Sequence, residues 1–78
     1  MDDPVSGECK VYSSNGKGVI LRKKPDGPLT SENAICTIPE GTILTILDQS
    51  EGWTQVPFID RYGTPHNGWA MSSFLRFG

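Results

Sequence analysis

The sequence predicts an all-β domain in which five or six short strands close into a small barrel. Residues 38–47 (IPEGTILTIL) join a glycine-centred turn to a β-branched run, and Trp53 and Trp69 each open a later strand-like segment. No segment has the spacing of an amphipathic helix. Nine glycines and six prolines supply the tight turns that many short strands require. Because closure removes exposed sheet edges, a barrel is the expected arrangement for 78 residues.

In the first half of the chain, strands are expected at residues 9–13, 18–25 and 34–38. Val11 faces inward in the first strand, and the pair Asn15-Gly16 that follows is a hairpin signal. In the second strand Val19 and Leu21 alternate with Ile20 and Arg22, and Pro25 ends the strand. Residues 26–33 (DGPLTSEN) form a loop. We expect residues 1–8 to be a linker-like leader and residues 9–78 to be the folded domain.

The second half begins with a turn at residues 39–41 and a strand at 42–47, in which Leu44 and Ile46 share one face. The remaining expected elements are a hairpin loop at 48–52, a strand at 53–58, a loop at 59–67, a strand at 68–71, one 3₁₀ turn at 72–74 and a closing strand at 75–77.

Composition narrows the classes of function. With 36% hydrophobic and 21% charged residues, the chain is too apolar for a disordered protein. Its net charge of −2 provides no general attraction for nucleic acid or anionic lipid. The basic run Arg22-Lys23-Lys24 is explained by its place at a strand end, where charge discourages pairing with other chains. No apolar run is long enough to span a membrane, so membrane insertion is not expected.

The sequence contains no arrangement of residues that is typical of a catalytic site or a metal site. Cys9 and Cys36 lack a CxxC spacing, and one histidine, His66, is too few for a metal site. The cysteines are interpreted as small buried hydrophobes, with an interstrand disulfide as the alternative. No nucleophile accompanies His66, and the paired acidic residues lie in the leader and a turn. We therefore expect neither enzymatic activity nor a cofactor.

Four segments in order carry a family resemblance: VILRKKP (19–25), IPEGTILTIL (38–47), GWTQV (52–56) and GWAMSSFL (68–75). Together they resemble the bacterial type of Src-homology-3-like domain, over residues 9–77. That family's pattern is a Leu-Asn-Val-Arg strand ending in proline, a Pro-x-Gly turn, Gly-Trp-x-x-Val, then Gly-Trp and a final leucine. Ile20 departs from it, because the family usually has asparagine there. The resemblance implies a Src-homology-3-like barrel.

The same residues are also similar to eukaryotic Src-homology-3 domains, with clear departures. The Ala-Leu-Tyr-Asp-Tyr signature is missing, and only Tyr12 lies near its place. Met71, Ser73 and Phe74 stand where that family has proline, asparagine and tyrosine. The first loop carries basic residues instead of an acidic cluster, so proline-rich peptides are not the expected ligand.

The candidate site is a shallow aromatic groove between the loops 13–33 and 48–52. Strand alternation places Thr54 and Val56 inward and Trp53 and Gln55 outward, and an outward indole suits peptide binding. The resemblance agrees, because the first hairpin tryptophan of the eukaryotic family lines the ligand groove. The alternative is that Trp53 caps the barrel mouth. The other candidate ligand-binding residues are Tyr12, Phe74, Ser72, Tyr62 and His66.

Several aromatic residues and His66 also have a structural interpretation. Trp69 is expected to cover the open end of the barrel, since Ala70 after it takes a core position. Tyr62 and His66 lie in the loop 59–67, which is either the opposite wall of the groove or a plain solvated hairpin.

The predicted function is a non-catalytic binding module, part of a larger protein, that recognises a short peptide or protein partner. The ligand is a cell-wall (peptidoglycan) peptide if the domain belongs to the bacterial envelope or is secreted. An intracellular partner, or the protein's own enzyme domain, is the alternative in the cytoplasm. A structural spacer without a ligand is a third interpretation. We expect a monomer.

Overall fold

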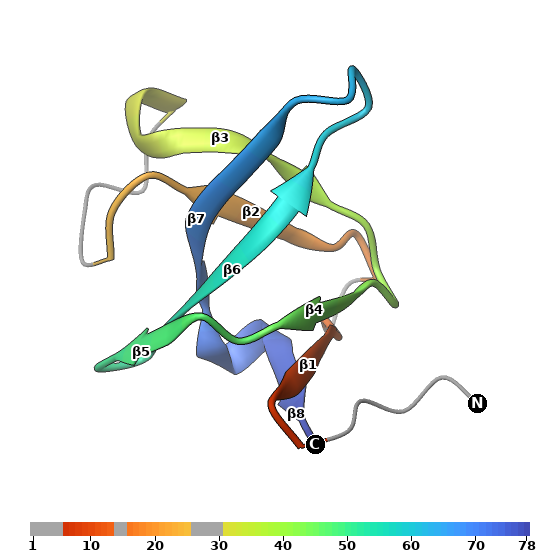
Figure 1. Ribbon diagram of the computed structural model, residues 1–78, viewed down its shortest axis with the longest axis vertical. Coiled ribbons are helices and arrows are strands. Elements are labelled where there is room, and N and C mark those ends of the chain that lie inside the picture. Colours follow the sequence, from red (N-terminus) through yellow and green to blue (C-terminus); the bar gives the residue numbers. More distant parts are fainter. Residues whose placement is uncertain (1–5, 14–15, 26–30) are drawn as a thin grey trace.

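A computed structural model describes residues 6–13, 16–25 and 31–78 (Figure 1). The elements are β1 (Glu8–Val11), β2 (Val19–Arg22), η1 (Ser31–Asn33), β3 (Ala34–Ile38), β4 (Ile43–Thr45), β5 (Asp48–Ser50), β6 (Trp53–Ile59), β7 (Pro65–Met71), η2 (Ser72–Phe74) and β8 (Leu75–Phe77). The described residues contain no α-helix. The all-β class and the 3₁₀ turn before the last strand are therefore confirmed. The turn predicted at Asn15-Gly16 and most of the loop 26–33 involve residues outside this description.

The strands form two antiparallel sheets and not the expected closed barrel. One sheet has the order β4-β1-β8 and the other β3-β2-β7-β6-β5. The predicted strand 42–47 breaks after Thr45, because the next two residues bond to different sheets. Ile46 N–H donates to Gly7 C=O at 3.0 Å, beside β1, whereas Leu47 N–H donates to Gln55 C=O on β6 at 2.8 Å. The chain thus passes from one sheet into the other at this corner.

Two expected loops are shorter than predicted. Residues 48–50 pair with β6 as strand β5, so the turn between β5 and β6 comprises Glu51 and Gly52, where Gly52 has φ +76°. Residues 65–67 belong to β7, and their pairing with β6 continues to Ile59 opposite Pro65. The loop predicted at 59–67 is therefore only the turn 60–64.

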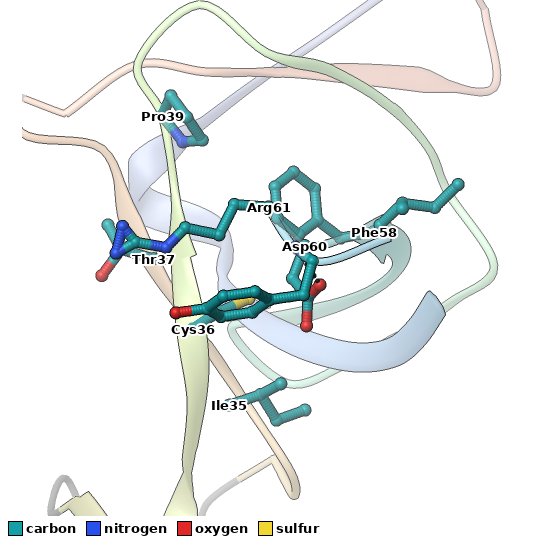
Figure 2. A pocket seen from close by; sticks show the side chains of 9 residues that line it. Ile35, Cys36, Thr37, Pro39, Phe58, Asp60 and Arg61 are labelled. Atoms are coloured by element: carbon teal, nitrogen blue, oxygen red, sulfur yellow. Dashed lines mark hydrogen bonds between the residues drawn. The ribbon is translucent and has the colours of Figure 1, made fainter. Parts of the chain in front are cut away.

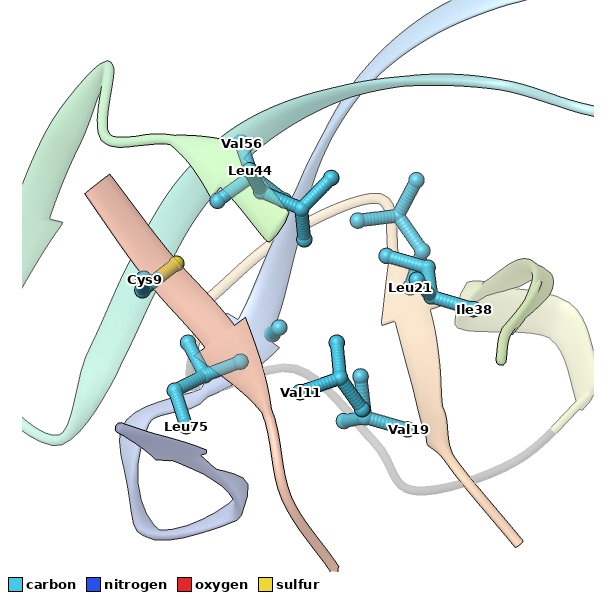
Figure 3. Close-up of a cluster of buried hydrophobic side chains, with 9 residues drawn as sticks. Cys9, Val11, Val19, Leu21, Ile38, Leu44, Val56 and Leu75 are labelled. Carbon is cyan, nitrogen blue, oxygen red and sulfur yellow. The ribbon is translucent and has the colours of Figure 1, made fainter. Parts of the chain in front are cut away.

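The core lies between the two sheets and draws side chains from both (Figure 3). Val11, Val19, Leu21 and Ala70 are buried, as the alternation of each strand predicts. The complete buried cluster is Cys9, Val11, Val19, Leu21, Ile38, Leu44, Val56, Ala70 and Leu75. Cys9 and Cys36 are both unbonded, with Cys9 buried and Cys36 half-buried.

The turn between β3 and β4 is fastened to the segment after β1. Ser13 donates its N–H and its hydroxyl to the Glu40 carboxylate at 2.8–3.1 Å, and Gly18 N–H donates to the Ser13 hydroxyl at 3.1 Å. These donors hold the pKa of Glu40 below its usual value. Gly18 has φ +86°, and a Cβ there would collide with the carbonyl oxygen of Ile38, so only glycine fits this approach.

Candidate binding site between strand β3 and the β6–β7 turn

A hollow of about 620 Å³ lies between strand β3 and the end of the β6–β7 hairpin (Figure 2). We call it the β3 hollow. Its lining residues are Ile35, Cys36, Thr37, Pro39, Phe58, Ile59, Asp60, Arg61 and Tyr62. They come from two segments, residues 35–39 and 58–62, that are separated by 18 residues in the sequence. The fold brings these segments together because β3 and the β6–β7 hairpin belong to the same five-stranded sheet.

The floor of the hollow continues the hydrophobic core. Ile35, Cys36 and Phe58 are partly buried, and all three pack against the buried cluster. Figure 2 shows Ile35 and Cys36 on the β3 side and Phe58 on the opposite side. The hollow is therefore an apolar surface that the fold leaves partly open.

The mouth of the hollow carries two large apolar side chains in solvent. Ile59 is 65% exposed and Tyr62 is 83% exposed. A small domain has few apolar residues to spare from its core. These are the two most exposed large apolar side chains among the described residues, and both border the same apolar hollow.

Asp60 fixes the shape of the turn that forms one wall. Its Oδ1 accepts the N–H groups of Tyr62 at 2.9 Å and Thr64 at 3.0 Å. Its Oδ2 lies 2.8 Å from His66 Nε2 on β7. The hydrogen bond with His66, followed by the backbone donors, lowers the pKa of Asp60. The negative charge of Asp60 is thus used within the turn itself.

Arg61 places a positive charge over the hollow. Its guanidinium carbon lies 5.5 Å from the centre of the Tyr62 ring. Figure 2 shows the side chain extended toward Thr37 on β3. Within the part of the chain that the structure describes, the guanidinium forms no ion pair. Arg61 is therefore the charged group of the hollow that remains available to a ligand.

Cys36 contributes a half-buried thiol to the floor of the hollow. Burial, followed by the nearby charge of Asp60, raises the pKa of its thiol. A protonated thiol is a weak nucleophile at neutral pH.

The prediction that Trp53 presents its indole to solvent is wrong. Thr54 and Val56 are buried as predicted, so Trp53 does lie on the opposite face of β6, yet its side chain is only 6% exposed. Trp53 sits between two neighbouring strands, with Ser50 of β5 and Met71 of β7 opposite it in register. Alternation along a strand determines the face of the sheet but not whether that face is covered.

The other candidate ligand-binding residues do not form one groove, because they lie in different parts of the surface. Ser72, whose hydroxyl lies 2.8 Å from that of Thr54, borders a shallow hollow of about 350 Å³ with Trp53. Phe74 borders a third hollow of about 200 Å³ and packs on the core. Tyr12 is half exposed, with the Arg76 guanidinium 3.9 Å from its ring centre. Gln55 is half-buried and lines none of these three hollows.

Tyr62 and His66 are the two predicted residues that the structure brings to the β3 hollow, Tyr62 as lining and His66 through Asp60. Sequence reasoning missed the β3 side and Arg61. One signal for them was available, because the segment IDRY (59–62), at the end of β6 and the start of the turn, carries two large apolar residues where polar ones are usual.

The described residues contain no cluster of three or more histidine, cysteine or acidic side chains that could hold a metal ion. None of their helices has the length and hydropathy needed to cross a membrane. A comparison of the chain with models of protein families, with curated proteins and with solved structures gave no match.

Proposed function

We propose that this protein is a non-catalytic binding module that recognises a short peptide or protein segment in the β3 hollow. The observation that carries the proposal is the pairing of an apolar floor, continuous with the core, with the exposed side chains of Ile59 and Tyr62. The volume of about 620 Å³ lies within the range of ligand sites. The expected resemblance to Src-homology-3-like modules agrees with a binding role.

The affinity of one copy should be modest. Burying an exposed isoleucine or tyrosine stabilises a complex by roughly 1.5–3 kcal/mol per side chain. Association costs at least about 4 kcal/mol in lost motional freedom. Two such side chains alone leave at most about 2 kcal/mol, so any tighter binding must come from the floor of the hollow and from polar contacts.

The proposal is tested by selecting nine-residue peptides from a display library on the immobilised 78-residue chain. Selected peptides should bind the Tyr62→Ala and Ile59→Ser variants at least tenfold more weakly. Phe77→Ala, a variant of an exposed side chain on β8, serves as the control for folding and surface apolarity. Bound peptide should also protect Cys36 from iodoacetamide, because Cys36 lies in the floor.

Two results would contradict this site. Peptides that lose affinity with Tyr12→Ala, and keep it with Tyr62→Ala, would return the site to the aromatic groove predicted from the sequence. Failure to enrich any peptide would favour a structural spacer.

A cell-wall peptide and a protein segment are two sources of the same kind of ligand. Sedimentation of the chain with purified peptidoglycan, reduced by Tyr62→Ala but not by Phe77→Ala, would identify the wall peptide. Absence of sedimentation, together with peptides enriched from the library, would identify a protein partner.

A further inference from the structure

Strand β3 is an uncharged edge strand of the larger sheet. Among the described strands it pairs only with β2, so one row of its backbone N–H and C=O groups faces away from the sheet. The other edge strands, β4, β5 and β8, have three residues each, and β5 begins with Asp48 whereas β8 contains Arg76. Strand β3 has five residues, AICTI, and no charge. Shortness, charge and bulges normally prevent an edge from pairing with another chain. Strand β3 is neither short nor charged, and its one bulge, at Ile35, leaves residues 36–38 in regular register with β2.

The β3 hollow runs along this free edge. Successive side chains of a strand point to opposite faces of a sheet. Ile35, Cys36 and Thr37 are consecutive, yet all three line the hollow. The bulge at Ile35 interrupts the alternation, which lets Ile35 and Cys36 contribute to the same hollow. Because three consecutive residues of β3 line the hollow, a ligand there lies along this strand, and β2 pairs with only one side of its backbone.

Arg61 places a positive charge beside the hollow, and this charge favours a ligand that carries a negative charge. Its guanidinium reaches toward Thr37, at the β3 side of the hollow (Figure 2), and pairs with no carboxylate in the described residues. The carboxylate of Asp60 is held by His66 and by the backbone of Tyr62 and Thr64. Guanidinium groups bind carboxylates through two parallel hydrogen bonds. The hollow thus complements a negatively charged ligand.

We propose that the ligand is an extended peptide segment that adds to the free edge of β3 as a further strand and places a carboxylate on Arg61. One apolar side chain of the segment enters the hollow and rests on Ile35 and Phe58. Backbone hydrogen bonds to β3 supply affinity that does not depend on sequence, and the hollow and Arg61 supply selectivity. This inference rests on the proposed function, because it uses the same hollow.

The test uses the peptides selected from the library above, each synthesised in three forms. The first is the selected peptide. The second is a neutral form, in which Asp and Glu are replaced by Asn and Gln and the C-terminus is amidated. The third form is a pair of peptides with N-methyl groups at alternate backbone nitrogens. One peptide is methylated at the odd-numbered residues and the other at the even-numbered residues. N-methylation removes the backbone N–H donors that a paired strand requires.

We expect the neutral form to bind at least tenfold more weakly than the selected peptide to the unmodified chain. With Arg61→Gln the two forms should bind alike. Arg76→Gln is the matched control, since Arg76 also stacks on a tyrosine but lies outside the hollow, and it should keep the tenfold difference. One N-methyl parity should abolish binding, and amide hydrogen exchange should slow at alternate residues of β3.

The outcomes separate this inference from the proposed function. Peptides that depend on Tyr62 but bind equally in neutral and N-methylated forms would overturn the inference and leave the proposed function intact. Peptides that do not depend on Tyr62 would overturn both. Slower exchange in β5, without a change in β3, would place the added strand on the opposite edge and contradict the inference.

Discussion

The two cysteines differ in environment although both are unbonded. Cys9 lies in β1, fully buried within the core, and burial followed by the charge of Glu8 raises the pKa of its thiol to about 11. Cys36 lies half-buried in the floor of the β3 hollow. Reactivity depends on both access and thiolate content, so these two thiols should react at very different rates.

We predict that iodoacetamide at pH 8 modifies Cys36 in the folded protein and leaves Cys9 unmodified. With a pKa of about 11, only about one Cys9 thiol in a thousand is ionised at pH 8, and its sulfur has no contact with solvent. Peptide mass mapping after timed labelling measures both rates. In 6 M guanidinium chloride the rates should become equal. Equal rates in the folded state would contradict the burial of Cys9.

Trp53 illustrates how far single residues can be interpreted from sequence. Its face of the strand was predictable, since Thr54 and Val56 are buried on the other side. Its burial was not, because this depends on two neighbouring strands, one of which has the polar sequence DQS and was not recognised as a strand. A pattern within one segment carries no information about what a neighbouring segment covers.

At the scale of the element, the turn 60–64 depends on a single carboxylate. Asp60 joins two backbone N–H groups of the turn to His66 on the returning strand. The pKa of Asp60 is lowered in the folded protein, so the ionised form binds these partners best. Its contribution to stability is complete above the ordinary pKa of aspartate, about 3.9. It is lost as the pH falls through the lower folded-state pKa.

We predict that Asp60→Asn lowers the free energy of unfolding at pH 7, and that the difference from the unmodified chain shrinks as the pH falls below about 4. The asparagine side chain can still accept hydrogen bonds from the backbone N–H groups of the turn, but it lacks the negative charge that favours the contact with His66. Urea unfolding at pH 7, 4 and 2.5 measures the difference. A difference that is constant with pH would show that the charge of Asp60 plays no part.

The elements with the clearest alternation were predictable, and those held by their neighbours were not. Strand β3 was predicted with its observed bounds, and β2 was predicted with the correct inward residues Val19 and Leu21. The polar strand β5 forms because β6 offers an edge to pair with, not because of its own composition. The same holds for residues 65–67, which continue a ladder that the Asp60 turn makes possible.

At the scale of the whole molecule, both sheets share one core. Cys9, Leu44 and Leu75 enter it from the smaller sheet, and Leu21, Ile38 and Val56 from the larger. Removing either sheet would expose the inward face of the other. The two sheets should therefore unfold together.

We predict one cooperative transition in urea. Trp53 and Trp69 report on the larger sheet through their fluorescence, and iodoacetamide labelling of Cys9 reports on the smaller sheet. The two probes should give the same midpoint concentration of urea. Labelling of Cys9 at lower urea than the fluorescence change would instead show that the smaller sheet opens first.

The β3 hollow depends on how distant segments pack in the whole molecule, which is why the sequence did not reveal it. It forms where β3 and the end of β6 come together without closing a cylinder. Tyr62 was predictable as a candidate from its loop, whereas Ile35, Cys36 and Thr37 resemble any buried strand.

Strands β1 and β8 lie side by side, and Gly78 N–H donates to Glu8 C=O at 3.2 Å. The β6–β7 turn lies at the other end of the long axis (Figure 1). Circular permutation should therefore succeed, with a short Gly-Ser connection across positions 7 and 78 and new termini cut between Glu51 and Gly52. Without permutation, the domain could instead be grafted into a surface loop of a host protein through positions 7 and 78. It would then be tethered by β1 and β8 at its base and would direct Arg61 and Tyr62 away from the host.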